Sequence, residues 1–131
     1  MDAHDCPFCR LEKHRIYLES ECAVAFLDGF PIAEGHTLVI PTRHVASLFE
    51  LPEEEQAAVW GLVAKVRTNL AVDFQPDGFN IGLNDGISAG QTVMHAHIHV
   101  IPRRNGDVAD PRGGVRWVMP DKARYWGEAR K

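Results

Sequence analysis

Short runs of β-forming residues alternate with turn residues through the first forty positions, and this pattern predicts strands. Residues 16–19 and 22–27 are two such runs, separated by two polar residues, and their spacing predicts a hairpin. The segment 28–35 contains glycine and proline and is predicted to be a loop. Residues 36–40 are a third predicted strand, which we expect Pro41 to end.

A long amphipathic helix is predicted next along the chain. Pro52 and the glutamates at 53–55 place a proline and negative charge in a first helical turn, where both are favoured. Residues 79–83 are a fourth predicted strand. Because helices and strands do not alternate as β-α-β units, the pattern predicts an α+β domain with a mainly antiparallel sheet. The apolar positions that recur at helical spacing, out to about Asp73, are Ala58, Val59, Leu62, Val63, Val66 and Leu70.

One segment in the C-terminal third places three histidines at every second position among β-formers. In a strand, His95, His97 and His99 would lie on one face, while the apolar residues between them would pack on the other. Imidazole titrates near neutral pH and serves as a base, a nucleophile or a metal ligand. The alternatives are a solvent-facing strand whose polar positions happen to be histidine, and an adventitious metal patch. Arg103 and Arg104 follow, and guanidinium groups suit an anionic ligand such as phosphate.

Length and composition fit one globular domain. The chain has 131 residues, of which 45% are hydrophobic and 24% charged. A net charge of −4, with both signs mixed, argues against nucleic-acid and membrane partners. The acidic opening at residues 1–5 lacks the apolar stretch of a signal peptide, so we expect a cytoplasmic protein. From Asn105 onward the chain is loop-like with scattered aromatic residues, and both an ordered arm and a frayed terminus fit this tail.

The three cysteines do not make a disulfide framework. Cys6 and Cys9 are spaced as Cys-x-x-Cys, which in an intracellular chain indicates metal or redox chemistry. The pair supplies two of the four ligands that a structural zinc needs, and by spacing alone His4 and His14 compete for the remainder. The alternatives are two reduced cysteines without a ligand, and a thioredoxin-like redox pair, for which the β-α-β context is missing.

These motifs resemble the histidine triad (HIT) family, whose signature is His-x-His-x-His followed by apolar residues. Residues 35–41 resemble the family's glycine-histidine strand, and residues 89–107 are closest to the fragile-histidine-triad branch of dinucleoside polyphosphate hydrolases. The resemblance implies the histidine-triad fold, a mainly antiparallel five-stranded sheet with one long helix and a short helix. It also implies a nucleotide-binding domain over residues 1–104, and an extension over 105–131 that packs on the domain or on the partner subunit of a homodimer.

The resemblance also implies an activity. Members of the family act at the α-phosphate of nucleoside phosphates through a covalent nucleotidyl-histidine. We therefore expect a nucleotidyl hydrolase or transferase whose purine nucleotide substrate is a dinucleoside polyphosphate, such as diadenosine tetraphosphate, or a related adenylylated compound. The alternatives are an adenosine-5′-phosphoramidase, a phosphorylase, a non-catalytic nucleotide-binding regulatory protein, and a metal-storage or metal-sensing protein.

Carried over residue by residue, the resemblance assigns three catalytic histidines. His97 would be the nucleophile, His99 would contact phosphate oxygens, and His36 would belong to the same polar network. A neutral imidazole is a good nitrogen nucleophile, and an unperturbed pKa of about 6.5 leaves it mostly neutral in the cytoplasm. Its second ring nitrogen must be held by an acceptor so that the attacking nitrogen keeps its lone pair. For His36 the alternative is a histidine at the edge of the core that the backbone satisfies.

The glycine loop before the triad is expected to contact phosphate. The resemblance implies hydrogen bonds to phosphate oxygens from Asn84, Gly90, Gln91 and Thr92. Asn84 and Gln91 are equally suited to capping the turn, and that alternative stays open.

The resemblance places the nucleoside near four other residues. Asp28 would hold the ribose hydroxyls; the fragile branch carries an amide there, so the acid resembles the wider family more closely. The adenine pocket would fall near Phe8, Phe26 and Ile32, although each of these side chains also suits an ordinary core.

Several bacterial members of the family complete a Cys-x-x-Cys metal site with two histidines, which here correspond to His44 and His95. The resemblance therefore implies a Cys2His2 zinc set made by Cys6, Cys9, His44 and His95. Four protein ligands leave no open coordination position, so this zinc is expected to be structural. No organic cofactor is expected.

Overall fold

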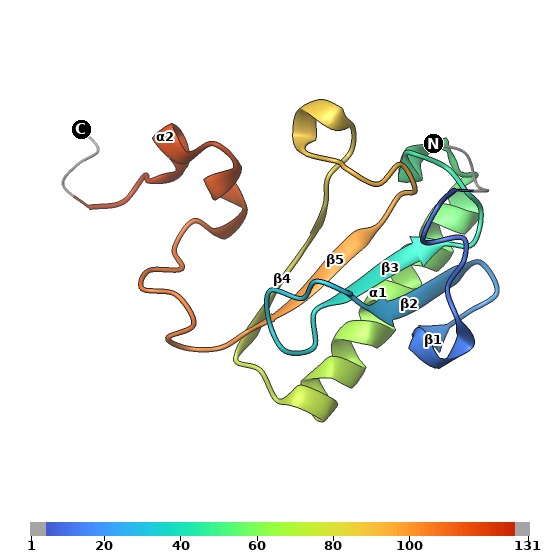
Figure 1. Cartoon of the computed structure of the whole chain (residues 1–131). Coiled ribbons are helices and arrows are strands. Elements are labelled where there is room, and N and C mark those ends of the chain that lie inside the picture. Colours follow the sequence, from blue (N-terminus) through green and yellow to red (C-terminus); the bar gives the residue numbers. More distant parts are fainter. Residues whose placement is uncertain (1–4, 128–131) are drawn as a thin grey trace.

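The computed structural model describes residues 5–127, and its body is a five-stranded sheet with one long helix on one face (Figure 1). The acidic opening at residues 1–4, and with it the alternative ligand His4, lies outside the described residues. The strands are β1 (Ile16–Glu19), β2 (Ala23–Leu27), β3 (Thr37–Pro41), β4 (Gly78–Leu83) and β5 (Ile98–Arg103), and the helices are α1 (Glu53–Phe74) and the short α2 (Pro120–Ala123). The predicted α+β class, the antiparallel five-stranded sheet and the two helices are confirmed.

The strand order is β1-β2-β3-β5-β4, and each neighbouring pair is antiparallel. The predicted hairpin is formed by β1 and β2. The third strand ends at Pro41, and Pro41 is itself the last paired residue, opposite Ala23, so β3 runs one residue beyond the predicted end at Ile40. The pairing of β3 with β5 covers only Thr37–Val39, so Pro41 has no neighbour on that side and its missing N–H costs no ladder bond.

The long helix covers one face of the sheet because its apolar stripe has a matching sheet surface to bury. Pro52 precedes the first turn, and the acids at 53–55 lie at the positive end of the helix dipole. The helix ends at Phe74, and the capping residue that follows, Gln75, has a left-handed φ of 48°. The buried stripe (Val59, Leu62, Val63, Val66, Leu70) packs with residues from the strands and the histidine segment (Ala23, Ala25, Val39, Ala96, Ile98, Val100).

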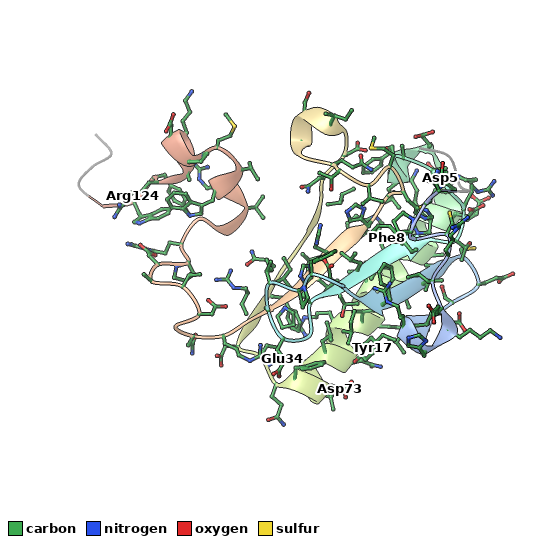
Figure 2. The ribbon with its side chains drawn as sticks, in the orientation of Figure 1. Asp5, Phe8, Tyr17, Glu34, Asp73 and Arg124 are labelled. Atoms are coloured by element: carbon green, nitrogen blue, oxygen red, sulfur yellow. The ribbon has the colours of Figure 1, made fainter. Side chains whose placement is uncertain are left out.

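The face of the sheet away from α1 carries a second, smaller apolar cluster. Phe26, Leu38 and Ile40 are buried there, and Phe8 from the N-terminal turn packs on them. Figure 2 shows Phe8 among side chains gathered near that turn, far from Arg124 in the C-terminal segment. This face is the one that holds the polar residues predicted to be functional.

The histidine segment is a strand only in its second half, which corrects the prediction of one strand through all three histidines. β5 begins at Ile98, so His99 lies in the sheet while His95 and His97 lie in an irregular segment before it. The backbone N–H of Ala96 donates to the carbonyl of Val45 rather than to a strand ladder. The alternation of side chains nevertheless persists, since Ala96 and Ile98 are buried toward α1.

After β5 the chain forms an arm that stands away from the sheet in Figure 1. The arm contains a 3-10 turn (Gly114–Val118) and α2, and the ion pair between Arg103 and Asp107 fixes its start. Within the arm, Trp126 lies against Arg112 at 4.9 Å, so this segment packs largely on itself. Over residues 5–127, no helix has the length and apolar character to cross a membrane.

Candidate active site and metal centre

The imidazole of His97 is held in one tautomer by the backbone. Its Nδ1 lies 2.8 Å from the carbonyl oxygen of His95. A carbonyl oxygen only accepts, so Nδ1 must donate its hydrogen and Nε2 of the neutral ring keeps its lone pair. The ring is 9% exposed, and the edge-on ring of Phe8 packs against it at 5.2 Å between centroids. This is the arrangement that a nitrogen nucleophile requires.

A second set of hydrogen bonds fixes the protons on His36 and His99. The backbone N–H of Ile32 donates to His36 Nδ1 at 3.2 Å, which places the hydrogen of the neutral ring on Nε2. His36 Nε2 lies 2.9 Å from His99 Nδ1, so it donates there, and His99 carries its own hydrogen on Nε2. The ring of His99 is 5.3 Å from that of His97. The hydrogen bonds from Ile32 through His36 therefore place an N–H on Nε2 of His99, the ring that lies next to His97.

Burial keeps this histidine network neutral. Desolvation, reinforced by His97 and His36, lowers the pKa of His99 to about 4, against a smaller opposing effect of Asp28. Desolvation also lowers the pKa of His36, and Asp28, whose Oδ2 is 3.5 Å from His36 Nε2, again opposes it. Two neutral imidazoles beside His97 leave its lone pair free of a competing fixed charge.

The other predicted substrate residues surround this network on the open face. Asp28 is half-buried, and its Oδ1 accepts the N–H of Phe30 at 2.9 Å. Phe8 and Phe26 meet edge to face at 5.3 Å, and Phe26 is 1% exposed, which gives it a place in the small apolar cluster. Ile32 is 76% exposed. The structure thus places Phe8 and Asp28 next to the histidines. Phe26 is buried in the apolar cluster and packs against Phe8.

The side chain of Gln91 is fully used inside its own loop. Its amide nitrogen donates to the carbonyls of Ala46 and Val93 at 2.8 and 3.0 Å, and its oxygen accepts the N–H of Gly86 at 2.9 Å. Both amide hydrogens are thereby committed, which favours the turn-capping alternative for Gln91 over donation to phosphate. The remaining loop residues predicted to contact phosphate, Asn84, Gly90 and Thr92, are exposed.

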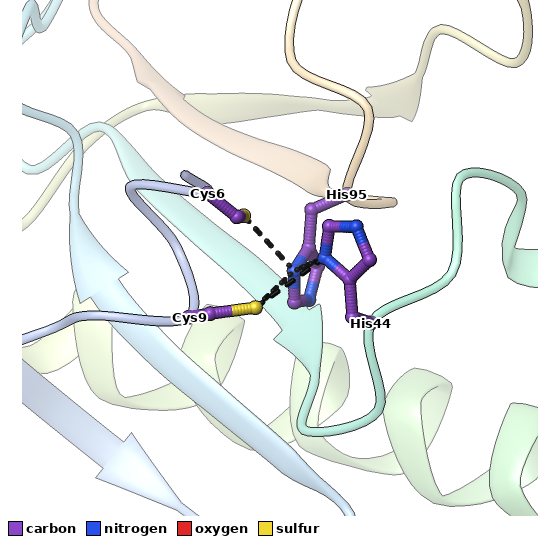
Figure 3. Close-up of side chains that lie close together, drawn as sticks. All are labelled: Cys6, Cys9, His44 and His95. Atoms are coloured by element: carbon purple, nitrogen blue, oxygen red, sulfur yellow. Dashed lines mark hydrogen bonds between the residues drawn. The ribbon is translucent and has the colours of Figure 1, made fainter. Parts of the chain in front are cut away.

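Cys6, Cys9, His44 and His95 converge at the end of the sheet nearest the N-terminal turn (Figure 3). Their donor atoms lie within 4.8 Å of one another. The N···S separations are 3.3–3.5 Å and the two Nδ1 atoms are 3.2 Å apart. A tetrahedron with Zn–S of about 2.3 Å and Zn–N of about 2.0–2.1 Å has edges of roughly this length. The residues therefore fit a Cys2His2 zinc site in both chemistry and spacing.

The tautomer of His95 also suits a metal ligand. Its Nε2 lies 2.8 Å from the carbonyl oxygen of Pro41 and must donate to it, so the lone pair is on Nδ1, which faces the cluster. Desolvation lowers the pKa of His95, with smaller contributions from His44 and His97, and so maintains the neutral form. Burial, followed by the neighbouring Cys6, raises the pKa of the Cys9 thiol, so two thiolates here need a cation to balance them.

Asp28, His36 and His99 form a second group with metal-ligand composition, but its protons are placed differently. The N–H of Ile32 occupies the lone pair of His36 Nδ1, so the neutral ring carries its hydrogen on Nε2, the atom that faces the other two residues. Binding a metal at Nε2 would require that hydrogen to leave. This group is therefore a hydrogen-bond network, in contrast to the cluster around His95.

Comparison with known proteins identifies the family. The HIT domain model matches residues 10–106. The chain belongs to the HIT family. This HIT protein is 35% identical over 131 residues to the adenosine 5′-monophosphoramidase hnt1 of Schizosaccharomyces pombe, covering 94% of the chain and 93% of the relative. It is 38% identical over 96 residues to the asymmetrical bis(5′-nucleosyl)-tetraphosphatase of the same yeast, covering 73% and 53%.

Among solved structures, this HIT protein is similar to a zinc-bound histidine triad family protein from Mycobacterium smegmatis. The TM-score is 0.73 and the identity 38%, covering 83% of this chain and 82% of that one. The family resemblance inferred from the triad and the glycine-histidine strand is therefore confirmed.

A groove beside His99 in this HIT protein was not predicted from sequence. A cavity of about 860 Å³ lies between the arm and the open face of β4 and β5. Its lining includes His99, Asn84 and Ile101 from the body and Trp117 from the arm. Trp117 lies in the tail, 18 residues after the triad, and no sequence pattern indicates that it shares a cavity with His99.

The charged groups of the groove are largely neutralised by one another. Arg103 donates to both carboxylate oxygens of Asp107 and to Asn80. Arg104 donates to the carbonyl of Phe74 and lies 3.6 Å from Glu34. Both arginines among the described residues of the groove, Arg103 and Arg104, are therefore already engaged by other groups rather than available to a phosphate chain.

Proposed function

We propose that this HIT protein transfers a nucleotidyl group from the α-phosphate of its substrate to His97 and then to water. The observation that carries the proposal is the hydrogen bond from His97 Nδ1 to the carbonyl of His95, because it leaves Nε2 unprotonated. Relatives named as a tetraphosphatase and a phosphoramidase support the same reaction class.

The reaction proceeds in two balanced steps. The lone pair of His97 Nε2 forms a bond to phosphorus, and the bond from phosphorus to the leaving atom breaks with its electron pair on that atom. His99, whose Nε2 carries a hydrogen, stabilises the negative charge that develops on the leaving atom or on the phosphate oxygens. Water then attacks the same phosphorus, the electron pair of the P–N bond returns to Nε2, and a nucleoside monophosphate and a proton are released.

The nucleoside is proposed to lie over the small apolar cluster. Phe8 offers a half-buried aromatic edge next to His97, and Ile32 offers an exposed apolar surface at the rim. The carboxylate of Asp28 accepts hydrogen bonds from the ribose hydroxyls. Backbone and side-chain donors of the exposed loop at 84–92 then approach the phosphate, with Gln91 bracing that loop from within.

Two leaving groups compete, and the groove beside His99 favours one of them. A dinucleoside polyphosphate releases a strongly anionic nucleotide, whereas a phosphoramidate releases an amine. The groove holds Glu34, Asp107 and Asp110 against two arginines that are already engaged. This charge balance supports the phosphoramidase as a second candidate beside the dinucleoside polyphosphate hydrolase.

A structural zinc is proposed at Cys6, Cys9, His44 and His95, where it would fasten the N-terminal turn to the body. A homodimer is also proposed. Its support is that β4 is an edge strand, which among the described residues pairs only with β5. Mass measured in solution tests the dimer, and a monomer at micromolar concentration would contradict it.

The decisive experiment for the reaction compares the parent protein with His97→Ala. Each is given diadenosine tetraphosphate or adenosine 5′-phosphoramidate, and intact mass is recorded during turnover. We expect an adenylyl adduct on the parent protein and a loss of turnover of several orders of magnitude in the variant. A variant that binds the nucleotide yet still turns it over would exclude His97 as the nucleophile. If the parent protein binds nucleotides without turnover or adduct, a nucleotide-binding regulatory role replaces the enzyme.

A further inference from the structure

His95 contacts both the metal-ligating cluster and the nucleophile. Its Nδ1 lies 3.4 Å from Cys6 Sγ, 3.5 Å from Cys9 Sγ and 3.2 Å from His44 Nδ1. Its main-chain carbonyl, at the other end of the same residue, accepts the Nδ1 hydrogen of His97 at 2.8 Å. One residue therefore connects two centres that otherwise use different side chains.

The backbone around His95 lies outside the sheet. The contacts of the His95 side chain therefore contribute strongly to fixing the position of this backbone. Residues 91–97 precede the first paired residue of β5, and the backbone N–H of Ala96 donates to the loop residue Val45. The imidazole of His95 is 1% exposed and is anchored through Nε2 to the carbonyl of Pro41 at 2.8 Å. Its Nδ1 supplies a second anchor only if the cluster holds it, and thiol–imidazole hydrogen bonds are weak anchors.

We infer that His95 is a positioning residue through which occupation of the Cys2His2 cluster sets the orientation and tautomer of His97. With all four donors attached to one ion, the His95 carbonyl stays beneath His97 Nδ1. When the ion is released, the hydrogen bond to Pro41 is the main contact that holds the His95 side chain. The main-chain carbonyl of His95 can then move away from His97 Nδ1. The ring of His97 then also populates the other tautomer, which has its hydrogen on the attacking nitrogen.

The inference rests on the proposed function of His97, but its size can be judged independently. Loss of one hydrogen bond of ordinary net strength changes an equilibrium by about five- to tenfold. We therefore expect kcat to fall by about that factor when the cluster is emptied. KM is expected to rise as well, because Phe8, which is proposed to contact the nucleoside, lies between the ligands Cys6 and Cys9 in the N-terminal turn.

The test uses the full chain as purified, the same protein after chelation, and Cys9→Ser. Cys9 is an exposed member of the cluster, and its hydrogen-bond partners are His44 and His95. Zinc content, kcat and KM for adenosine 5′-phosphoramidate, and the nitrogen-15 shifts of the His97 ring are measured below the melting temperature of every sample. Val66→Ala is the matched control, since it removes buried volume from α1, which contributes no side chain to either centre, and lowers stability by a separate route.

The expected result has two parts: kcat falls about five- to tenfold after chelation and in Cys9→Ser but not in Val66→Ala, and the His97 ring shifts report a mixture of tautomers. Unchanged shifts, or a kcat that falls equally in Val66→Ala, would overturn the inference and leave the metal a purely stabilising role. If no sample turns over nucleotide, the proposed function fails, and the ring shifts alone decide whether His95 links the two centres.

Discussion

His36 donates its Nε2 hydrogen to His99 Nδ1 across 2.9 Å, and this bond determines which atom of His99 faces the site with a hydrogen. The backbone N–H of Ile32 determines the direction of the donation by occupying the other nitrogen of His36. The main-chain N–H of Ile32 thus determines, through His36, which nitrogen of His99 carries the hydrogen.

Replacing His36 is therefore expected to weaken catalysis without removing the nucleophile. His36→Ala should lower kcat by about tenfold with a smaller change in KM. The variant removes the N–H that His99 Nδ1 accepts, and this hydrogen bond fixes the tautomer of His99. Steady-state kinetics with diadenosine tetraphosphate and adenosine 5′-phosphoramidate measure the effect. His97→Ala is the reference for complete loss, and a His36→Ala rate equal to that of the parent would show that the network is not used.

Stability is expected to decrease in mild acid because the buried histidines resist protonation. The pKa of His99 is about 4 in the folded protein against 6.5 for a free side chain, owing to burial first and then to His97 and His36, with Asp28 opposing. Between these two values the unfolded chain binds a proton that the folded protein does not, so the free energy of unfolding falls as pH falls. The upper limit is about 3 kcal/mol for this residue.

Urea denaturation at pH 7 and pH 4.5 tests this acid sensitivity. His99→Gln should show a smaller loss between the two pH values, with a residual slope from His36 and His95, whose pKa values are also lowered. Parallel pH dependences for the parent and the variant would contradict the assignment to His99.

Zinc is expected to copurify in a 1:1 ratio and to be lost from Cys6→Ser. Because the four ligands join the N-terminal turn, the loop after β3 and the segment before β5, the variant should be destabilised by several kcal/mol. Elemental analysis and thermal melting measure both effects. Cys22→Ser is the matched control, since Cys22 is a third free cysteine outside the cluster, and a parent protein free of metal would eliminate the site.

The groove predicts a leaving-group effect at Trp117. Trp117→Ala should lower kcat/KM about fivefold for an adenosine phosphoramidate of an arylalkylamine and leave adenosine 5′-phosphoramidate unaffected, because ammonia does not reach the cavity wall. Tyr125→Ala, on the same arm but outside the cavity lining, is the control. Equal losses on both substrates, with a shift in solution mass, would instead assign the groove to a second copy of the chain.

Gly35 precedes the histidine strand in a conformation that excludes other side chains. Its φ is 88°, and an added Cβ would lie 3.0 Å from the Phe74 ring and 3.2 Å from Pro102. Gly35→Ala should therefore reduce the free energy of unfolding by about 1–3 kcal/mol. Gly61→Ala is the opposite case, since it lies in α1 with open space around it and should add about 0.5–1 kcal/mol. Urea denaturation measures both effects, and changes of the same sign in the free energy of unfolding of the two variants would contradict the prediction.

Sequence patterns predicted those features whose causes are local. The stripe on α1 and the run of β-formers in β2 and β3 each define a buried face within a few residues, so these elements were predicted closely. The start of β5 was not, because His95 and Ala96 have the same alternation as a strand and only their distant partners, Pro41 and Val45, show that they lie outside the ladder.

The site divides in the same way. Residue types and spacing pointed to the triad and the cysteine pair, and the family resemblance added His36 and His44, but the proton positions depend on backbone partners, such as Ile32 for His36, that no motif specifies. Gln91 looked like a phosphate ligand because its amide is a good donor. Its two hydrogens are used by Ala46 and Val93, which no local pattern could reveal.

The N-terminal turn has a consequence for where this protein can be cut. The family domain match starts at residue 10, yet Cys6, Phe8 and Cys9 precede it and touch His95 or His97. A fragment trimmed to the domain boundary would retain the whole triad and the whole sheet while losing two of the four proposed metal ligands and the aromatic ring that packs on the proposed nucleophile. The smallest functional unit of this chain is therefore expected to be larger than the matched domain and to include the turn that the domain boundary leaves out.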